Sequence, residues 1–225
     1  MGKTAILVDG AFYRKRAFHF WGDKSPEARA KELCQYCKRH IKEEKPATSL
    51  YRVFYYDCPP SDKAVYHPLL DRSVELGSNP LFSWTEKFFD ELRHQRKFAL
   101  RLGRLAEEQA YYTLRPAIVR KLVNGTVQIN ELKESDFVLS IQQKGVDMRI
   151  GIDISSLAFK RQVDQIILIS GDSDFVPAAK QARREGIDFI LDPMRMKIKD
   201  DLYEHIDGLR TKAPKEPQKD HDKTK

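Results

Sequence analysis

The chain has 225 residues, of which 40 are Lys or Arg and 33 are Asp or Glu, giving a formal net charge of +7 and a pI near 9.2. Hydrophobic residues make up 41%, enough for a sizeable core, which excludes wholesale disorder. No apolar run reaches the roughly 20 residues of a membrane helix, and the first run is too short for a signal peptide. We therefore expect a soluble, cytoplasmic protein.

The first part of the chain predicts a strand, a helix and a second strand. Residues 4–8 are a continuous apolar run closed by Asp9, which is typical of a strand covered on both faces. Residues 26–45 open with a Ser-Pro pair and carry apolar residues at helical spacing. Residues 49–56 are β-branched and aromatic, which predicts the second strand.

The middle of the chain has weaker patterns. Residues 57–80 are rich in Pro, Ser and Asp and predict an extended loop, whereas residues 84–98 predict an amphipathic helix. Alternating apolar and basic residues predict a strand at 99–105, and an Asn-Gly pair predicts a hairpin turn at 123–127. We expect residues 58–137 to be an insertion that shapes substrate choice.

The last part of the chain alternates helices and strands again. The predicted helices and strands, in chain order, lie at 146–160, 164–169, 175–185, 187–191 and 198–206. Such alternation at both ends predicts an α/β three-layer sandwich with a mostly parallel central sheet. We expect one domain over residues 1–210, followed by a disordered basic tail at 211–225 because that segment lacks large apolar residues.

Carboxylates follow the clearest strands. Asp9 comes directly after the first strand, and Asp172 and Asp174 come after the strand at 164–169. Asp147 stands where a predicted helix begins. Because ligands bind at the carboxyl ends of parallel strands, we expect the four side chains to converge as catalytic residues. The alternative is that such residues are only helix N-caps or turn formers.

An all-oxygen cluster predicts a particular kind of cofactor. Carboxylates without His or Cys select Mg²⁺ or Mn²⁺, and we expect Asp9, Asp147 and Asp172 to be the metal ligands. Ser170 and Asp153 are expected to support the site from outside the metal sphere. Asp153 lies about 120° around the predicted helix from Asp147 and about 9 Å further along it, so a purely structural role is its alternative.

Three motifs together resemble the NYN domain in its LabA-like branch. They are Ile6-Leu7-Val8-Asp9-Gly10, Lys144-Gly145-Val146-Asp147 with Asp153 six residues on, and Ile169-Ser170-Gly171-Asp172-Ser173-Asp174-Phe175. The resemblance covers roughly residues 4–57 and 138–210. NYN domains belong to the PIN-like nucleases, so it implies a metal-dependent ribonuclease whose acidic cluster holds Mg²⁺ or Mn²⁺. The family often has Asn where this chain has Phe12.

Basic side chains near the motifs indicate a nucleic-acid partner. Arg14, Lys15 and Arg16 follow the first motif with aromatic residues interleaved, and Lys144 precedes Asp147. Basic residues position phosphates and aromatic residues stack on unpaired bases. We therefore expect these four residues to bind RNA in single-stranded or unstructured regions. The alternative is a solvated helix face.

Two other functions are alternatives to the ribonuclease. A phosphatase of the haloacid dehalogenase type needs a second Asp two residues after the first, but residue 11 is Ala. A nucleic-acid-binding or regulatory module that has lost turnover stays open, as does a homo-oligomer. The three cysteines are an odd number and argue against a disulfide framework.

Overall fold

The computed structural model describes residues 2–42 and 48–215. Its centre is a six-stranded sheet, and all of the neighbouring strands in it run parallel. The strands of this sheet are β1 (Lys3–Asp9), β2 (Ser49–Asp57), β5 (Phe98–Leu102), β10 (Gln165–Ile169), β11 (Asp188–Asp192) and β12 (Gly208–Leu209). Their order is β12-β11-β10-β1-β2-β5, so β1 lies at the centre, as its apolar sequence predicts.

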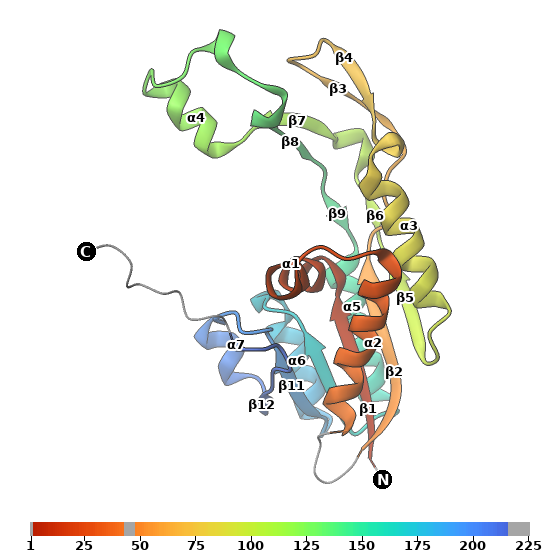
Figure 1. Ribbon diagram of the computed structural model, residues 1–225. Helices are drawn as coiled ribbons and strands as arrows, with labels where there is room; N and C mark the ends of the chain where they lie inside the picture. Colours follow the sequence, from red (N-terminus) through yellow and green to blue (C-terminus); the bar gives the residue numbers. More distant parts are fainter. Residues whose placement is uncertain (1, 43–47, 216–225) are drawn as a thin grey trace, which may run out of the picture.

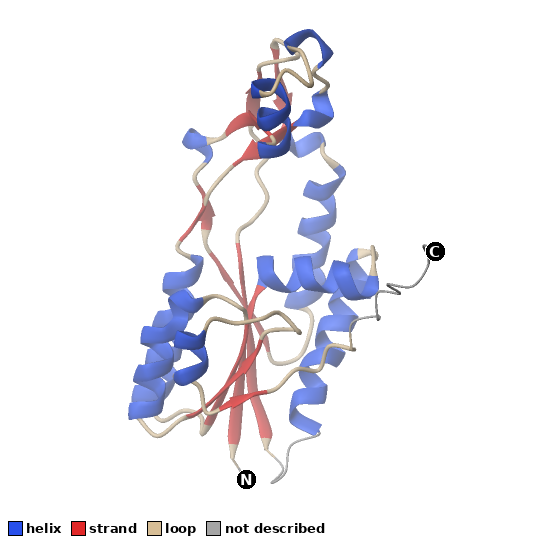
Figure 2. Cartoon of the chain, turned by 90° about the vertical axis from the view of Figure 1, so that its left-hand side faces the viewer, coloured by secondary structure: helices blue, strands red, loops and turns tan. Residues whose placement is uncertain are grey.

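Helices cover both faces of the sheet (Figures 1 and 2). One face carries α1 (Gly10–Trp21), α2 (Pro26–Lys42) and α3 (Pro80–Arg93), and the other carries α5 (Val146–Phe159), α6 (Val176–Arg184) and the short α7 (Asp200–Glu204). Along β1, Ile6 and Val8 pack under the first group of helices, and Ala5 and Leu7 pack under the second. The predicted three-layer α/β sandwich with a mostly parallel sheet is confirmed.

Two helices differ from the sequence prediction. The pattern predicts no element after Asp9, yet α1 forms there, because its alternating basic and aromatic residues hide the helical period. α3 begins before the predicted residue 84, since the Asn79 side chain accepts a hydrogen bond from the Leu81 N–H and Pro80 occupies the first helical position.

A long arm extends beyond the carboxyl ends of the strands (Figure 1). We define the arm as residues 59–79 and 103–145. Its helices, strands and 3₁₀ turns are β3 (Ala64–His67), β4 (Arg72–Glu75), η1 (Leu76–Ser78), β6 (Arg104–Leu105), η2 (Glu107–Gln109), β7 (Tyr111–Leu114), α4 (Pro116–Val123), η3 (Ile129–Glu131), η4 (Glu134–Asp136), β8 (Phe137–Ser140) and β9 (Gln143–Lys144). The pairs β3–β4, β6–β9 and β7–β8 are antiparallel.

The arm corrects the predicted insertion and its turn. Only part of the range 58–137 stands outside the core, because α3 and β5 belong to the central layers and residues 138–145 return through the arm. The predicted hairpin turn at 123–127 is wrong. That Asn-Gly pair closes α4 instead, with Gly125 at a φ of 68° and the Thr126 N–H bonded to the Lys121 carbonyl.

The beginning of the predicted tail is packed on the domain. Ala213 is buried, the Lys212 N–H donates to the Tyr36 hydroxyl, and the Arg195 Nε donates to the Ala213 carbonyl. The rest of the predicted tail, residues 216–225, lies outside the described residues. Across the described ranges, no helix has both the length and the apolar character that crossing a bilayer requires. All three cysteines are buried free thiols.

Candidate active site

Neighbouring parallel strands place carboxylates at one edge of the sheet. β1 lies between β10 and β2, with Val8 level with Ile169 on one side and Asp9 level with Tyr56 on the other. Asp9 therefore ends β1 beside Asp57, which ends β2. Asp172 lies three residues past the end of β10, on the same edge.

Asp9 is held in place by two hydrogen bonds. Its Oδ1 accepts the Phe12 N–H over 3.1 Å, which caps α1, and its Oδ2 accepts the Ser170 hydroxyl over 3.1 Å. Burial raises the pKa of Asp9 from 3.8 to about 6; the two hydrogen bonds oppose the shift, and the negative charges of Asp147 and Asp57 add to it. Ser170 is fully buried and contacts Asp9 as its predicted supporting role requires.

Asp147, Asp172 and Asp174 form the other half of the cluster. Asp147 lies in the first turn of α5, and burial followed by the charges of Asp172 and Asp174 raises its pKa. Asp172 caps η5 (Ser173–Phe175), since its Oδ1 accepts the Asp174 N–H over 3.0 Å. Asp9 and Asp172 are thus helix N-caps, as the alternative has it, and the charges of Asp147 on Asp9 and of Asp172 and Asp174 on Asp147 show that the carboxylates also lie within electrostatic reach of one another.

The cluster is open rather than a closed metal cage. In the part of the chain that the structure describes, no three His, Cys, Asp or Glu side chains form a group that could hold a metal ion. Mg²⁺ commonly binds to one or two carboxylates, keeps several waters and takes its remaining ligands from substrate phosphates. An open set of carboxylate oxygens that repel one another fits that mode of binding.

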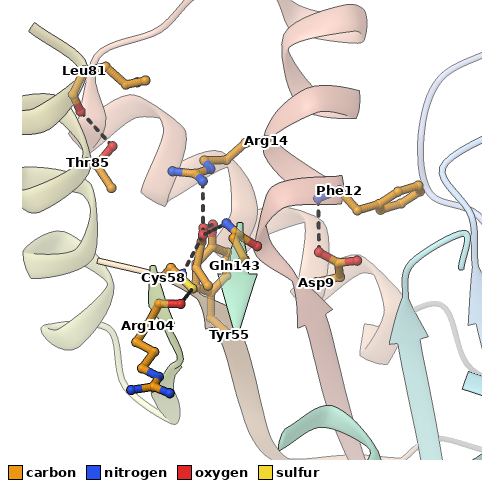
Figure 3. Close-up of polar contacts among 10 residues, drawn as sticks. Asp9, Phe12, Arg14, Tyr55, Cys58, Leu81, Thr85, Arg104 and Gln143 are labelled. Atoms are coloured by element: carbon orange, nitrogen blue, oxygen red, sulfur yellow. Dashed lines mark hydrogen bonds and ion pairs between the residues drawn. The ribbon is translucent and has the colours of Figure 1, made fainter. Parts of the chain in front are cut away.

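Asp57 is a site residue that the sequence analysis missed. Its side chain is fully buried and accepts hydrogen bonds from the Tyr55 hydroxyl, the Cys58 N–H and the Gln143 amide, and it pairs with Arg14. Figure 3 shows Arg14, Gln143, Cys58 and Tyr55 close together. Burial raises the pKa of Asp57 against the effect of Arg14. The signal was available, because Asp57 follows the predicted strand at 49–56 just as Asp9 follows its own.

The predicted RNA-binding triplet does not form one surface. Arg14 Nη2 pairs with Asp57 Oδ1 at 3.1 Å, whereas Arg16 donates to the Met194 carbonyl at 2.8 Å and 3.1 Å. Lys15 lies between them and is exposed. Successive residues of a helix point about 100° apart, so α1 directs the three side chains to different places. Of the three, Arg14 is the one that joins the acidic cluster.

Lys144 and Asp153 have different surroundings in the structure. Lys144 is exposed on β9, where it lines a pocket of about 560 Å³ with Arg104 at the base of the arm. Asp153 accepts the Tyr56 hydroxyl at 2.8 Å and the Arg101 Nε at 3.1 Å. These bonds tie α5 to β2 and β5, which fits the structural alternative for Asp153, and its role in supporting the metal site stays a prediction.

Phe12 takes the place of the polar residue that the resemblance leads one to expect. A Cβ atom added to Gly171 would lie 3.1 Å from Phe12 Cε2, so the aromatic ring packs against the backbone of the loop that carries Asp172. Figure 3 shows this ring directed away from the Asp9 carboxylate, while the Phe12 N–H bonds to it. Phe12 thus supports the site through its backbone and by packing.

Comparison with protein families decides the identity. The family model of the NYN domain matches residues 81–202, more than half of the chain. This chain belongs to the NYN domain family. NYN domains are a family of PIN-like nucleases. The matched range includes Asp147, Asp172 and Asp174, whereas Asp9 and Asp57 lie before it, so their place in the cluster rests on the sheet.

A solved structure of the same fold is similar over nearly the whole NYN chain. It is the crystal structure of a protein of unknown function from Vibrio parahaemolyticus, with 16% identity, a TM-score of 0.50, and coverage of 93% of this chain and 92% of that one. The likeness supports the fold alone. No curated protein matches this chain.

Proposed function

We propose that this NYN domain is a metal-dependent ribonuclease that hydrolyses RNA phosphodiester bonds at the cluster of Asp9, Asp147, Asp172 and Asp174. The observation that carries the proposal is Asp9, a half-buried carboxylate whose pKa is about 6 and whose neighbours include Asp57 and Asp147. Like charges concentrated at the ligand-binding edge of a parallel sheet destabilise the empty site and favour a bound cation.

Asp9, Asp147 and Asp172 would hold Mg²⁺ or Mn²⁺ through carboxylate oxygens. When bound, such an ion lowers the pKa of a water and neutralises charge on a phosphate. The chain's own residues prepare the site for it. Ser170 fixes one oxygen of Asp9 through its hydroxyl, and the Phe12 N–H fixes the other. Asp174 adds negative charge beside Asp147.

Arg14 is placed to contact the substrate backbone. Its side chain is 26% exposed and pairs with Asp57, next to Asp9 in the sheet. A guanidinium has five N–H donors, and the ion pair engages Nη2. Arg14 can therefore stay anchored on Asp57 while its other donors bind a phosphate of the RNA. Lys144 lies exposed next to the start of α5 and offers a second positive charge.

The experiment is cleavage of an end-labelled, unstructured RNA by the full chain. We expect products with Mn²⁺ or Mg²⁺, none with EDTA, and at least a hundredfold lower initial rate for Asp172→Asn. Asp172 is exposed, so this variant should melt at the wild-type temperature. Equal rates for wild type and Asp172→Asn would refute the assignment of the site.

The alternative function is a nucleic-acid-binding or regulatory module with weak turnover. It is favoured by one observation, namely that no three metal-ligating side chains are grouped within the described ranges. RNA binding without cleavage at any divalent ion concentration would establish it in place of the ribonuclease. We also propose the LabA-like branch of the family, on the three sequence motifs, and a cytoplasmic location.

A further inference from the structure

A pocket lies beside the acidic cluster between α1, the start of α2 and α3. Its volume is about 450 Å³, within the 300–1,000 Å³ usual for small-molecule sites. The lining residues are Arg14, Phe18, Asp23, Arg29, Pro80, Leu81 and Trp84. Arg14 lines this pocket and pairs with Asp57, which ends the strand next to Asp9, so Arg14 links the pocket to the edge of the sheet that carries the cluster.

The walls of this pocket combine apolar side chains with charged ones, namely Arg14, Asp23 and Arg29, and Arg29 is buried and paired with Glu32. Phe18 is 61% exposed and Leu81 is 63% exposed, so both side chains present apolar surface to a ligand in this pocket. Trp84 is held in a fixed orientation, because its Nε1 donates to the Lys24 carbonyl at 2.9 Å and its ring stacks on Phe88. Figure 3 shows Arg14 and Leu81 on facing elements, α1 and α3.

The groove on the other side of the acidic cluster has the opposite character. It lies between α5 and α6, with a volume of about 710 Å³, and it is lined by Asp147 and Asp174 together with apolar and neutral polar residues. None of its lining residues is basic. A phosphate backbone would meet only negative charge there, whereas Arg14 meets it on the α1 side. Charge therefore favours the α1–α3 side for the path of the strand.

We propose that the pocket between α1 and α3 binds one unpaired base of the RNA strand next to the cleaved bond, with Arg14 on the adjoining phosphate. The inference rests on the proposed ribonuclease function. Phe18 supplies an aromatic face for stacking, and Trp84 and Leu81 close the apolar wall. Aromatic stacking is tolerant of base identity, so the pocket selects unpaired over paired nucleotides, and a duplex cannot place a base in it.

The test uses an end-labelled single-stranded RNA oligonucleotide and its singly abasic versions, with binding measured by fluorescence anisotropy. The parent protein is the full chain carrying Asp172→Asn, and every titration contains EDTA. Phe18→Ala is compared with Phe159→Ala, a matched control that removes a ring with 73% exposure, against 61% for Phe18, from the end of α5. Neither ring belongs to the core, so both variants should have the same melting temperature as the parent.

We expect Phe18→Ala to raise the Kd for the intact RNA about 5- to 100-fold, the range for loss of one stacked base, and Phe159→Ala to leave it unchanged. At one position an abasic site should weaken binding to the parent by a similar factor and add nothing in Phe18→Ala. Unchanged binding by Phe18→Ala, or abasic effects that all persist in it, would overturn the inference.

Failure of the pocket and failure of the proposed function give different results. If the wild-type protein cleaves RNA while the Phe18→Ala variant binds RNA as tightly as the parent, the ribonuclease function is supported and the pocket is refuted. If Phe18→Ala weakens binding but the wild-type protein does not cleave RNA, the pocket is supported and the ribonuclease function is refuted. Absence of RNA binding by the parent overturns the pocket, and the ribonuclease is then decided by the cleavage assay alone.

Discussion

The guanidinium of Arg14 and the carboxylate of Asp57 form an ion pair at 3.1 Å between α1 and the end of β2, with the Asp57 side chain fully buried. Removing one partner of a buried pair leaves the other charge without compensation, which is more costly than losing both. The pair therefore holds α1 beside the acidic cluster. Arg14, which belongs to the predicted RNA-binding triplet, thus also stabilises the fold.

Arg14→Ala should lower the free energy of unfolding by about 3 kcal/mol at pH 7, measured by urea denaturation. Lys15→Ala is the control on the same helix and should change it by less than about 0.5 kcal/mol, since Lys15 is exposed. Adding Asp57→Asn to Arg14→Ala should recover at least half of the loss. Equal effects of Arg14→Ala and Lys15→Ala would show that the ion pair does not stabilise the domain.

Asp9→Asn should stabilise the metal-free protein at pH 7 by about 1–3 kcal/mol. The pKa of Asp9 is about 6 in the fold and 3.8 ordinarily, so the folded state holds its proton more tightly. Asp9 therefore contributes most to wild-type stability below its ordinary pKa of 3.8, and this contribution falls as the pH rises from 3.8 to about 6 and stays low above it. Urea denaturation in EDTA at pH 4, 5, 6 and 7 measures the difference.

The gain from Asp9→Asn should be small at pH 4, where Asp9 is protonated in the folded state and still about half protonated in the unfolded state. Asp62→Asn, at an exposed position of the arm, should show no comparable pH-dependent gain. A gain from Asp9→Asn that is the same at pH 4 and pH 7 would contradict the electrostatic account of the cluster.

Gly10→Ala should destabilise the domain by about 1–3 kcal/mol, as overpacking of a tight site does. A Cβ at position 10 would lie 2.6 Å from Asp57 Oδ2 and 2.6 Å from the Tyr55 ring and hydroxyl. Gly151→Ala is the matched control, because a Cβ there meets nothing within 4 Å. It should stabilise α5 by about 0.5–1 kcal/mol. Thermal melting of both variants checks the contrast, and a tolerated Gly10→Ala would contradict the close approach.

Local sequence patterns predicted much of the site because its carboxylates end or follow regular elements. Asp9 and Asp172 each follow a buried strand, and their proximity follows from β1 and β10 being neighbours. Asp57 could have been found by the same rule. Predicting these residues requires only the apolar pattern of the strands and the parallel direction of the sheet.

Other features depend on pairings that no local pattern contains. The arm is closed by β6–β9 and β7–β8, which join residues about 23 to 40 positions apart in the chain. Arg14 and Arg16 could be separated only once α1 was known to be a helix. The role of Asp153 could be assigned only from its hydrogen-bond partners, Tyr56 and Arg101, which come from two strands of the sheet.

The central claim is that the cluster of Asp9, Asp147, Asp172 and Asp174 hydrolyses RNA, and α5 offers a direct comparison within one helix. Asp147 belongs to the cluster, whereas Asp153, six residues further along, bonds to Tyr56 and Arg101. The measurement is the initial rate of Mn²⁺-dependent cleavage of an unstructured RNA by Asp147→Asn and by Asp153→Asn. We predict a loss of at least a hundredfold for Asp147→Asn and less than about threefold for Asp153→Asn, with folding of each checked by melting. Equal rates for the two variants, or a greater loss for Asp153→Asn, would contradict the account.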